Sequence, residues 1–206
     1  MQNSSTNLGF TGKLNHIGES IFSKMTSLSN QHQAINLSQG FPDFEADAKL
    51  IELVDHYIKR GYNQYAPMAG ALPLRGKLCE SANNQHGCSY HAEKEITITA
   101  GATQAIATAL AASIREGDEV IVFSPAYDSY IPMIELNGGT AITVKLAHPA
   151  YSIDWEQFKL LLNHRTKMII LNTPHNPSGA VWKDADYLKL QEFVGNSNIL
   201  ILADEV

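Results

Sequence analysis

The sequence ends on the apolar run ILILADEV, in which Asp204 stands at the carboxyl end of an expected buried strand. A buried carboxylate is costly unless a cation or hydrogen bonds accompany it. Asp204 therefore needs a cationic partner, and a protonated ring nitrogen would serve. The interaction indicated is an ion pair between the Asp204 carboxylate and a protonated heterocycle.

A second candidate is the segment TAGATQA, where Gly101, Ala102 and Thr103 stand at an expected strand-to-helix junction. The N–H groups and positive dipole of a helix start attract anions, Gly101 allows close approach, and Thr103 adds a hydroxyl donor. A plain N-terminal cap needs the same residues, and helix starts are far more common than phosphate sites. Taken alone, the motif fits the plain cap better, and it is neither GxGxxG nor a P-loop.

Two further loops carry chemistry beyond expected strands. Tyr127, in SPAYDSY, could stack on a flat ligand, although an aromatic packed at a helix start explains it equally well. In NTPHNPSG, two prolines and a glycine stiffen a turn, so Asn176 presents a held amide that can donate to a ligand oxygen. His175 is interpreted as a loop residue, because the eight histidines show no HxxH or HExxH spacing, and no metal is expected.

One ligand satisfies all four segments. It has a phosphate for residues 101–103, a flat ring for Tyr127, a ring oxygen for Asn176 and a ring N–H for Asp204. These features describe pyridoxal 5′-phosphate (PLP), whose ring accepts electrons when a carboxylate keeps its nitrogen protonated.

Strands and helices alternate from residue 95 onward, which predicts an α/β fold. The expected strands are continuous apolar runs, at 95–99, 120–124, 141–146, 167–172 and 199–203. Helical patterns separate them, at 103–114, 127–139, 154–163 and 184–195. We expect a three-layer α/β/α arrangement around a mostly parallel sheet, with the four candidate loops at its carboxyl edge.

The first part of the chain is predicted to hold helices and one short strand. The helices are expected at 20–31, at 47–61 with Asp47 as its cap, and at 73–87, and the strand begins at residue 35. We expect residues 1–45 to form an N-terminal arm and part of a small domain. Residues 46–206 are expected to form a large PLP-binding domain.

Composition excludes several classes of protein. The net charge of −6, without a block of Lys and Arg, argues against nucleic acid or an anionic membrane as a partner. Cys79 and Cys88 form neither a disulfide framework nor a CxxC site. The start lacks a signal peptide and no apolar run approaches the ~20 residues of a membrane span, so the expected compartment is the cytoplasm.

In their order, six segments resemble class I/II aminotransferases of PLP fold type I: NLSQGFPDF, YNQYAPMAGALPLRGKL, ITITAGATQAI, DEVIVFSPAYDSY, LNTPHNPSGAVW and ILADEV. The chain is most similar to the kynurenine/glutamine/methionine–oxoacid group. The resemblance covers nearly all of it from about residue 15, and implies the large domain of that fold, incomplete.

The resemblance implies that residues 101–103 hold the cofactor phosphate and that Tyr127 stacks on the pyridine ring. It implies that Asn176 donates to the ring 3′-oxygen near the substrate carboxylate. Asp204, the one catalytic residue expected within this chain, pairs with the pyridinium nitrogen.

Three more residues receive roles from the resemblance alone. Tyr65 reaches the phosphate in the neighbouring subunit, which implies a homodimer, unless it is an ordinary exposed loop tyrosine. Gly40 lines the substrate carboxylate site. Phe22 borders the substrate side chain, unless it is an apolar contact that holds down the N-terminal arm.

The implied activity is transamination between a neutral, aromatic or sulfur amino acid and a 2-oxo acid. Family members run to nearly twice this length, and their Schiff-base lysine and carboxylate-binding arginine fall beyond residue 206. The chain is therefore expected to be an N-terminal half that is inactive alone. Alternatives are a PLP-dependent cysteine-S-conjugate (carbon–sulfur) β-lyase on the same scaffold, an inert fragment, or a non-catalytic sensor, which the short segment before residue 15 disfavours.

Overall fold

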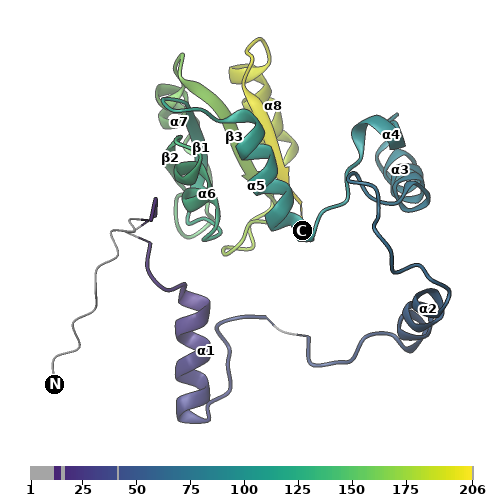
Figure 1. Cartoon of the computed structure of the whole chain (residues 1–206). Coiled ribbons are helices and arrows are strands. Elements are labelled where there is room, and N and C mark those ends of the chain that lie inside the picture. Colours follow the sequence, from purple (N-terminus) through teal and green to yellow (C-terminus); the bar gives the residue numbers. More distant parts are fainter. Residues whose placement is uncertain (1–11, 15–16, 41, 206) are drawn as a thin grey trace. The chain divides into compact units, whose positions relative to one another are not determined.

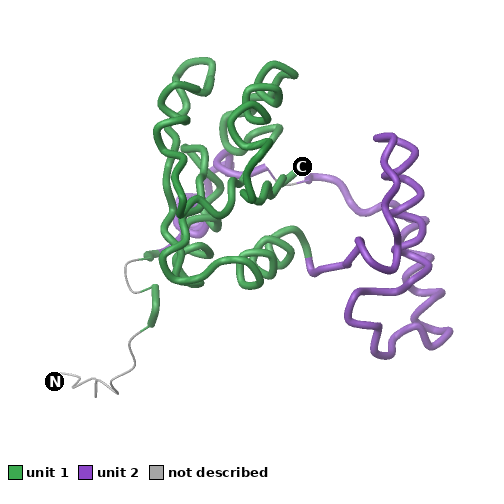
Figure 2. The backbone as a smooth tube through the Cα atoms, turned by 90° about the horizontal axis from the view of Figure 1, so that it is seen from above, with its two compact units in different colours: residues 1–18, 101–206 green, residues 19–100 purple. Residues whose placement is uncertain are grey.

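The computed structural model describes residues 12–14, 17–40 and 42–205. The chain divides into two compact units (Figure 2). The sheet unit comprises residues 1–18 and 101–206, and the helical unit comprises residues 19–100. The predicted domain division at residue 45 stays a prediction.

Four parallel strands form the sheet, in the spatial order β2-β1-β3-β4 (Figure 1). Their bounds are β1 (Glu119–Ser124), β2 (Thr140–Lys145), β3 (Thr166–Asn172) and β4 (Leu200–Asp204). The helices of this unit are α5 (Gly101–Ser113), α6 (Tyr130–Leu136), α7 (Trp155–Leu161) and α8 (Asp184–Val194). The predicted α/β fold with a parallel sheet is confirmed.

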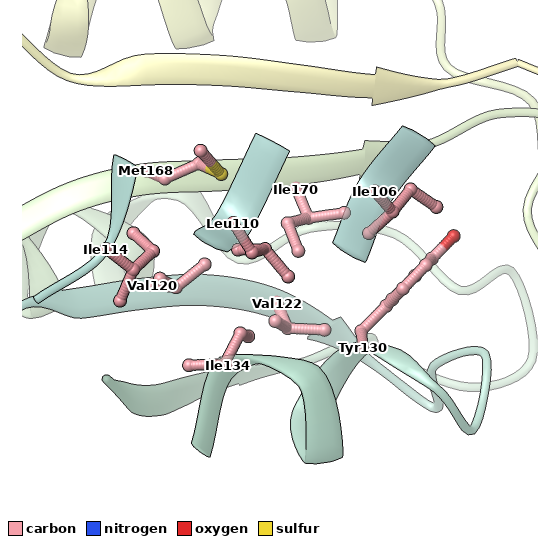
Figure 3. Close-up of a cluster of buried hydrophobic side chains, with 9 residues drawn as sticks. All are labelled: Ile106, Leu110, Ile114, Val120, Val122, Tyr130, Ile134, Met168 and Ile170. Atoms are coloured by element: carbon pink, nitrogen blue, oxygen red, sulfur yellow. The ribbon is translucent and has the colours of Figure 1, made fainter. Parts of the chain in front are cut away.

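The sheet is covered on both faces because successive strand residues point in opposite directions. Val120 and Val122 of β1 pack with residues of α5 and α6, in the cluster drawn in Figure 3. Ile121 and Phe123, which alternate with them, pack with Phe158 of α7 and with α8. The apolar run VIVF within β1 fits this arrangement, since both faces of the strand are buried.

The helical unit contains α1 (Ile21–His32), α2 (Ala48–Lys59), α3 (Leu72–His86) and the short α4 (Ala92–Glu95). The first three lie where the sequence predicts them. The Asp47 side chain accepts a hydrogen bond from the Lys49 N–H at 2.8 Å, which confirms it as the cap of α2. Among the described helices, none is long and apolar enough to cross a membrane.

Arg75 of α3 is a buried cation in the helical unit, 8% exposed. Its Nε donates to the Gly70 carbonyl at 3.1 Å, and its Nη1 donates to the carbonyls of Ala92 at 3.2 Å and Glu93 at 3.4 Å. The Ile96 carbonyl lies 3.5 Å from Nη1. One guanidinium thus joins the start of α3 to both ends of α4.

The strands predicted at residues 95–99 and at residue 35 are wrong. Within the described residues, neither segment pairs with a strand, and a strand requires a hydrogen-bonded neighbour. In the first segment, the Ile98 N–H donates to the Ala69 carbonyl at 3.0 Å, which ties it to the helical unit instead.

The loop after β3 closes around His175, which is 4% exposed. Its N–H donates to the Ala180 carbonyl at 2.8 Å, and its ring Nδ1 lies 2.6 Å from the Ser178 hydroxyl. Burial lowers the pKa of His175, and hydrogen bonds to the backbone of Pro125 and Phe123 offset this shift only in part. The neutral imidazole therefore joins this loop to the loop after β1.

Leu110 of α5 tests the packing of α5 on the sheet, because it is fully buried. Leu110→Ala is expected to lower the free energy of unfolding by about 2–5 kcal/mol, since it leaves a cavity. Leu160→Ala on α7, at a position 84% exposed, is the matched control, with an expected change within about 0.5 kcal/mol. Urea denaturation measures both, and equal losses would contradict the packing described.

His175 gives a second prediction, on pH. A histidine with a lowered folded-state pKa stabilises the fold fully above its ordinary pKa of about 6.5, and this contribution is lost as the pH falls below that value. The wild-type chain should therefore lose free energy of unfolding between about pH 7.5 and about pH 5, and His175→Asn should show a shallower dependence. Denaturation at several pH values measures this, and parallel profiles would refute a buried neutral His175.

Candidate cofactor site

A pocket of about 170 Å³ opens at the carboxyl edge of the sheet. It is lined by residues from four separate segments of the sheet unit: Ala102, Thr103, Ile106, Tyr127, Tyr130, Asn172, Asn176 and Asp204. Five of these were predicted from the sequence as site residues. The parallel strands bring them together, because each loop follows the carboxyl end of its strand or begins a helix beside that edge.

The start of α5 forms one wall of the pocket. Gly101 begins the helix with φ +78°, a left-handed conformation that favours glycine. A Cβ at Gly101 would meet nothing within 4 Å, so the backbone conformation rather than crowding requires glycine there. Ala102 and Thr103 line the pocket, which places the positive end of the helix dipole at its wall.

Asp204, at the end of β4, also lines the pocket. The Tyr130 hydroxyl donates to its Oδ2. Within the described part of the chain, Oδ1 accepts no hydrogen bond from another residue. Burial, followed by the neighbouring Asp204 carboxylate, raises the pKa of Tyr130 well above its ordinary range. Tyr130 therefore stays protonated and acts as the donor of this bond.

Asn172 fixes two parts of the pocket at once. It pairs with Asp204 in the parallel register of β3 and β4, and its Nδ2 donates to the Asp204 carbonyl at 2.9 Å. Its Oδ1 accepts the Asn176 backbone N–H at 2.6 Å. Because Asn172 is 5% exposed and uses both ends of its amide, it is a structural link, while Asn176 brings its side chain to the pocket.

The ring of Tyr127 is half-buried and packs edge-on against Tyr130, with centroids 5.7 Å apart and planes at 64°. Tyr127 also lines the pocket, so one part of its ring remains available to a flat ligand. The position of Tyr127 is compatible with both explanations, packing in the core and stacking on a flat ligand.

The sequence analysis missed Tyr130 and Asn172. A signal for each was present, because Tyr130 lies about one helical turn after Tyr127 and Asn172 ends an apolar strand just as Asp204 does. Neither signal separates a site residue from an ordinary core tyrosine or a strand-end amide. Only the pairing of β3 with β4 and the packing of α6 bring them to the pocket.

The other three predicted residues belong to the helical unit. Tyr65 is fully exposed, as both the loop-tyrosine and the subunit-contact interpretations require. A Cβ added to Gly40 would meet nothing within 4 Å. Phe22 lines a separate hollow together with Gln39 and residues of α1. Their roles stay predictions.

The donor set of the pocket fits PLP. A carboxylate with one oxygen unused suits a protonated ring nitrogen, and a helix start suits a phosphate. An amide and an aromatic ring, from Asn176 and Tyr127, line the same pocket. Among the described residues, no group of three or more His, Cys, Asp or Glu side chains is gathered as a metal site would require.

Comparisons with known proteins agree with this reading. The family model "Aminotransferase class I and II" matches residues 32–206. The methionine aminotransferase of Escherichia coli is 46% identical over 94% of this chain and 50% of its own length. A probable kynurenine–oxoglutarate transaminase of Saccharomyces cerevisiae is 33% identical over 87% of this chain and 43% of its own.

Solved structures show the same fold. The crystal structure of Escherichia coli YbdL, described as having a methionine aminotransferase function, superposes with a TM-score of 0.92 at 46% identity. The alignment covers 96% of this chain and 52% of that one. The chain thus spans about half the length of the relatives it matches. With the family model matched over most of its residues, this chain belongs to the class I and II aminotransferases.

Proposed function

We propose that the pocket at the sheet edge binds PLP, and that the protein transfers an amino group between an amino acid and a 2-oxo acid. The observation that carries the proposal is Asp204, which ends β4 in the same pocket as the start of α5 and keeps Oδ1 unused within the described chain. A carboxylate and a helix start that face one small pocket match a ligand with a cationic ring and an anionic tail.

Each wall of the pocket has one task in this proposal. Residues 101–103 hold the phosphate, Tyr127 lies against the ring, and Asn176 donates to the ring oxygen. Asp204 accepts a hydrogen bond from the protonated ring nitrogen. When bound, PLP supplies an electron-accepting ring for chemistry at the substrate α-carbon.

The substrate is proposed by likeness to relatives. The Escherichia coli relative is a methionine aminotransferase and the yeast relative a probable kynurenine–oxoglutarate transaminase, which supports a neutral, sulfur or aromatic amino donor. Gly40 and Phe22 are proposed to border this substrate. Tyr65, which is fully exposed, is proposed to serve the phosphate of a second subunit in a homodimer.

We further propose that the Schiff-base lysine is not among these 206 residues. Within the described part of the chain, no lysine lines the pocket. The 206-residue chain would then bind PLP without covalent attachment and would not catalyse transamination alone.

The Asp204 proposal is tested with PLP titrations of the chain, read by equilibrium dialysis. Asp204→Asn keeps the shape of the side chain and removes its charge, so PLP affinity is expected to fall about tenfold, the value of one charge-assisted hydrogen bond. Glu205→Gln, which makes the same charge change at the next, exposed residue, is the control and should bind as the wild type does. Equal affinities in all three would refute Asp204 as the ring-nitrogen partner.

The lysine proposal is tested by reducing the PLP-loaded chain with sodium borohydride, followed by peptide mass spectrometry. No pyridoxyl group is expected on any of its lysines beyond the background of the denatured chain. A single lysine labelled stoichiometrically would overturn the proposal, and its position would identify the attachment site.

A further inference from the structure

Tyr130 contacts two of the side chains that the proposed cofactor ring would meet. Its hydroxyl donates to Oδ2 of Asp204, and its ring packs edge-on against Tyr127 with centroids 5.7 Å apart. Tyr130 lines the pocket itself, although its side chain is only 2% exposed. Tyr130 is therefore a buried part of the pocket wall.

The hydrophobic core holds Tyr130 in place. Its ring belongs to the cluster that includes Ile106 of α5, Val122 of β1 and Ile134 of α6. Figure 3 shows the ring at the edge of this cluster, with the hydroxyl oxygen pointing out of it. The hydroxyl cannot shift without repacking three elements, because close-packed cores tolerate little displacement.

The carboxylate that Tyr130 meets is anchored as well. Asp204 is the last residue of β4, and its carbonyl accepts the Asn172 side chain at 2.9 Å. With its backbone held and Oδ2 engaged, rotation of the Asp204 carboxyl group is restricted. Oδ1 is left for a donor in the pocket.

The direction of the hydrogen bond follows from protonation. Burial and the nearby carboxylate both favour the neutral phenol, so Tyr130 donates throughout the ordinary pH range. Tyr130 is thus the donor at Oδ2, and Oδ1 is left to face a cationic N–H in the pocket. Tyr127 is a further titratable group beside this pair.

We propose that Tyr130 is a positioning residue for the cofactor: it orients Asp204 so that one carboxylate oxygen meets the ring nitrogen, and it braces Tyr127 against the ring. This inference rests on the proposed function. The competing explanation is a core tyrosine whose hydroxyl bonds the nearest acceptor and has no effect on the ligand.

The test compares PLP with 1-deazapyridoxal 5′-phosphate, in which a C–H replaces the ring nitrogen. Tyr130→Phe keeps the ring packing and removes the hydroxyl. PLP affinity is expected to fall about tenfold, the equivalent of one hydrogen bond to a charged group, while the affinity for the deaza analogue changes less than about twofold. Tyr187→Phe on α8 removes a hydroxyl outside the pocket and should leave both affinities unchanged.

A second arm places Tyr130→Phe in the Asp204→Asn background. If Tyr130 acts through Asp204, the double variant should bind PLP as weakly as Asp204→Asn alone. Equal losses for PLP and the deaza analogue, independent losses in the double variant, or no loss at all would each overturn the inference.

A ligand-free measurement separates this inference from the proposed function. The melting temperatures of the two single variants and the double variant form a cycle, and the double variant should lose less than the sum of the single losses. If the wild-type chain binds no PLP, the proposed function fails, whatever the cycle shows. Additive losses in melting temperature would refute the coupling between Tyr130 and Asp204, even if PLP binds.

Discussion

The last pair of the β3–β4 ladder, Asn172 opposite Asp204, is the constraint on which the candidate site depends. The Asn172 amide holds the Asp204 carbonyl on one side and the Asn176 N–H on the other. Two loops that are about thirty residues apart are therefore fixed by one buried side chain. A shift of one residue in this register would move Asp204 to the other face of the sheet and remove the carboxylate from the pocket.

The hydrophobic core of the sheet unit and the candidate site share residues, among them Tyr130. The same cluster that buries Val122 and Ile134 also buries the Tyr130 ring, whose hydroxyl ends at Asp204. The other face of the sheet contributes no residue to the pocket in the described chain, although His175 joins the loops after β1 and β3 behind it. The geometry of a polar site is thus set largely by apolar packing, which is stiff because it is dense.

Sequence patterns predicted the parallel sheet, its helices and five pocket residues, since periodicity and the carboxyl-edge rule need only local information. They could not find Tyr130, because an apolar-looking helix start becomes part of the site only when α6 packs beside β4's last residue. The prediction of a strand at 95–99 was wrong because pairing, like packing, cannot be seen in a local pattern. A strand is defined by its neighbour, and EITIT finds none in the described chain. The roles of Tyr65, Gly40 and Phe22 remain predictions that rest on the family resemblance.

Arg75 shows how the helical unit holds the chain next to that segment, which joins no strand in the described residues. The carbonyls of Ala92 and Glu93 in α4 and of Ile96 just after it are gathered around one guanidinium. The guanidinium group presents its N–H donors in a fixed planar arrangement. Among the described residues, no carboxylate forms an ion pair with it. A lysine has the same charge but only one nitrogen, so it could not span the start of α3 and both ends of α4 together. At this position the planar shape of arginine, rather than its charge alone, is what the local fold requires.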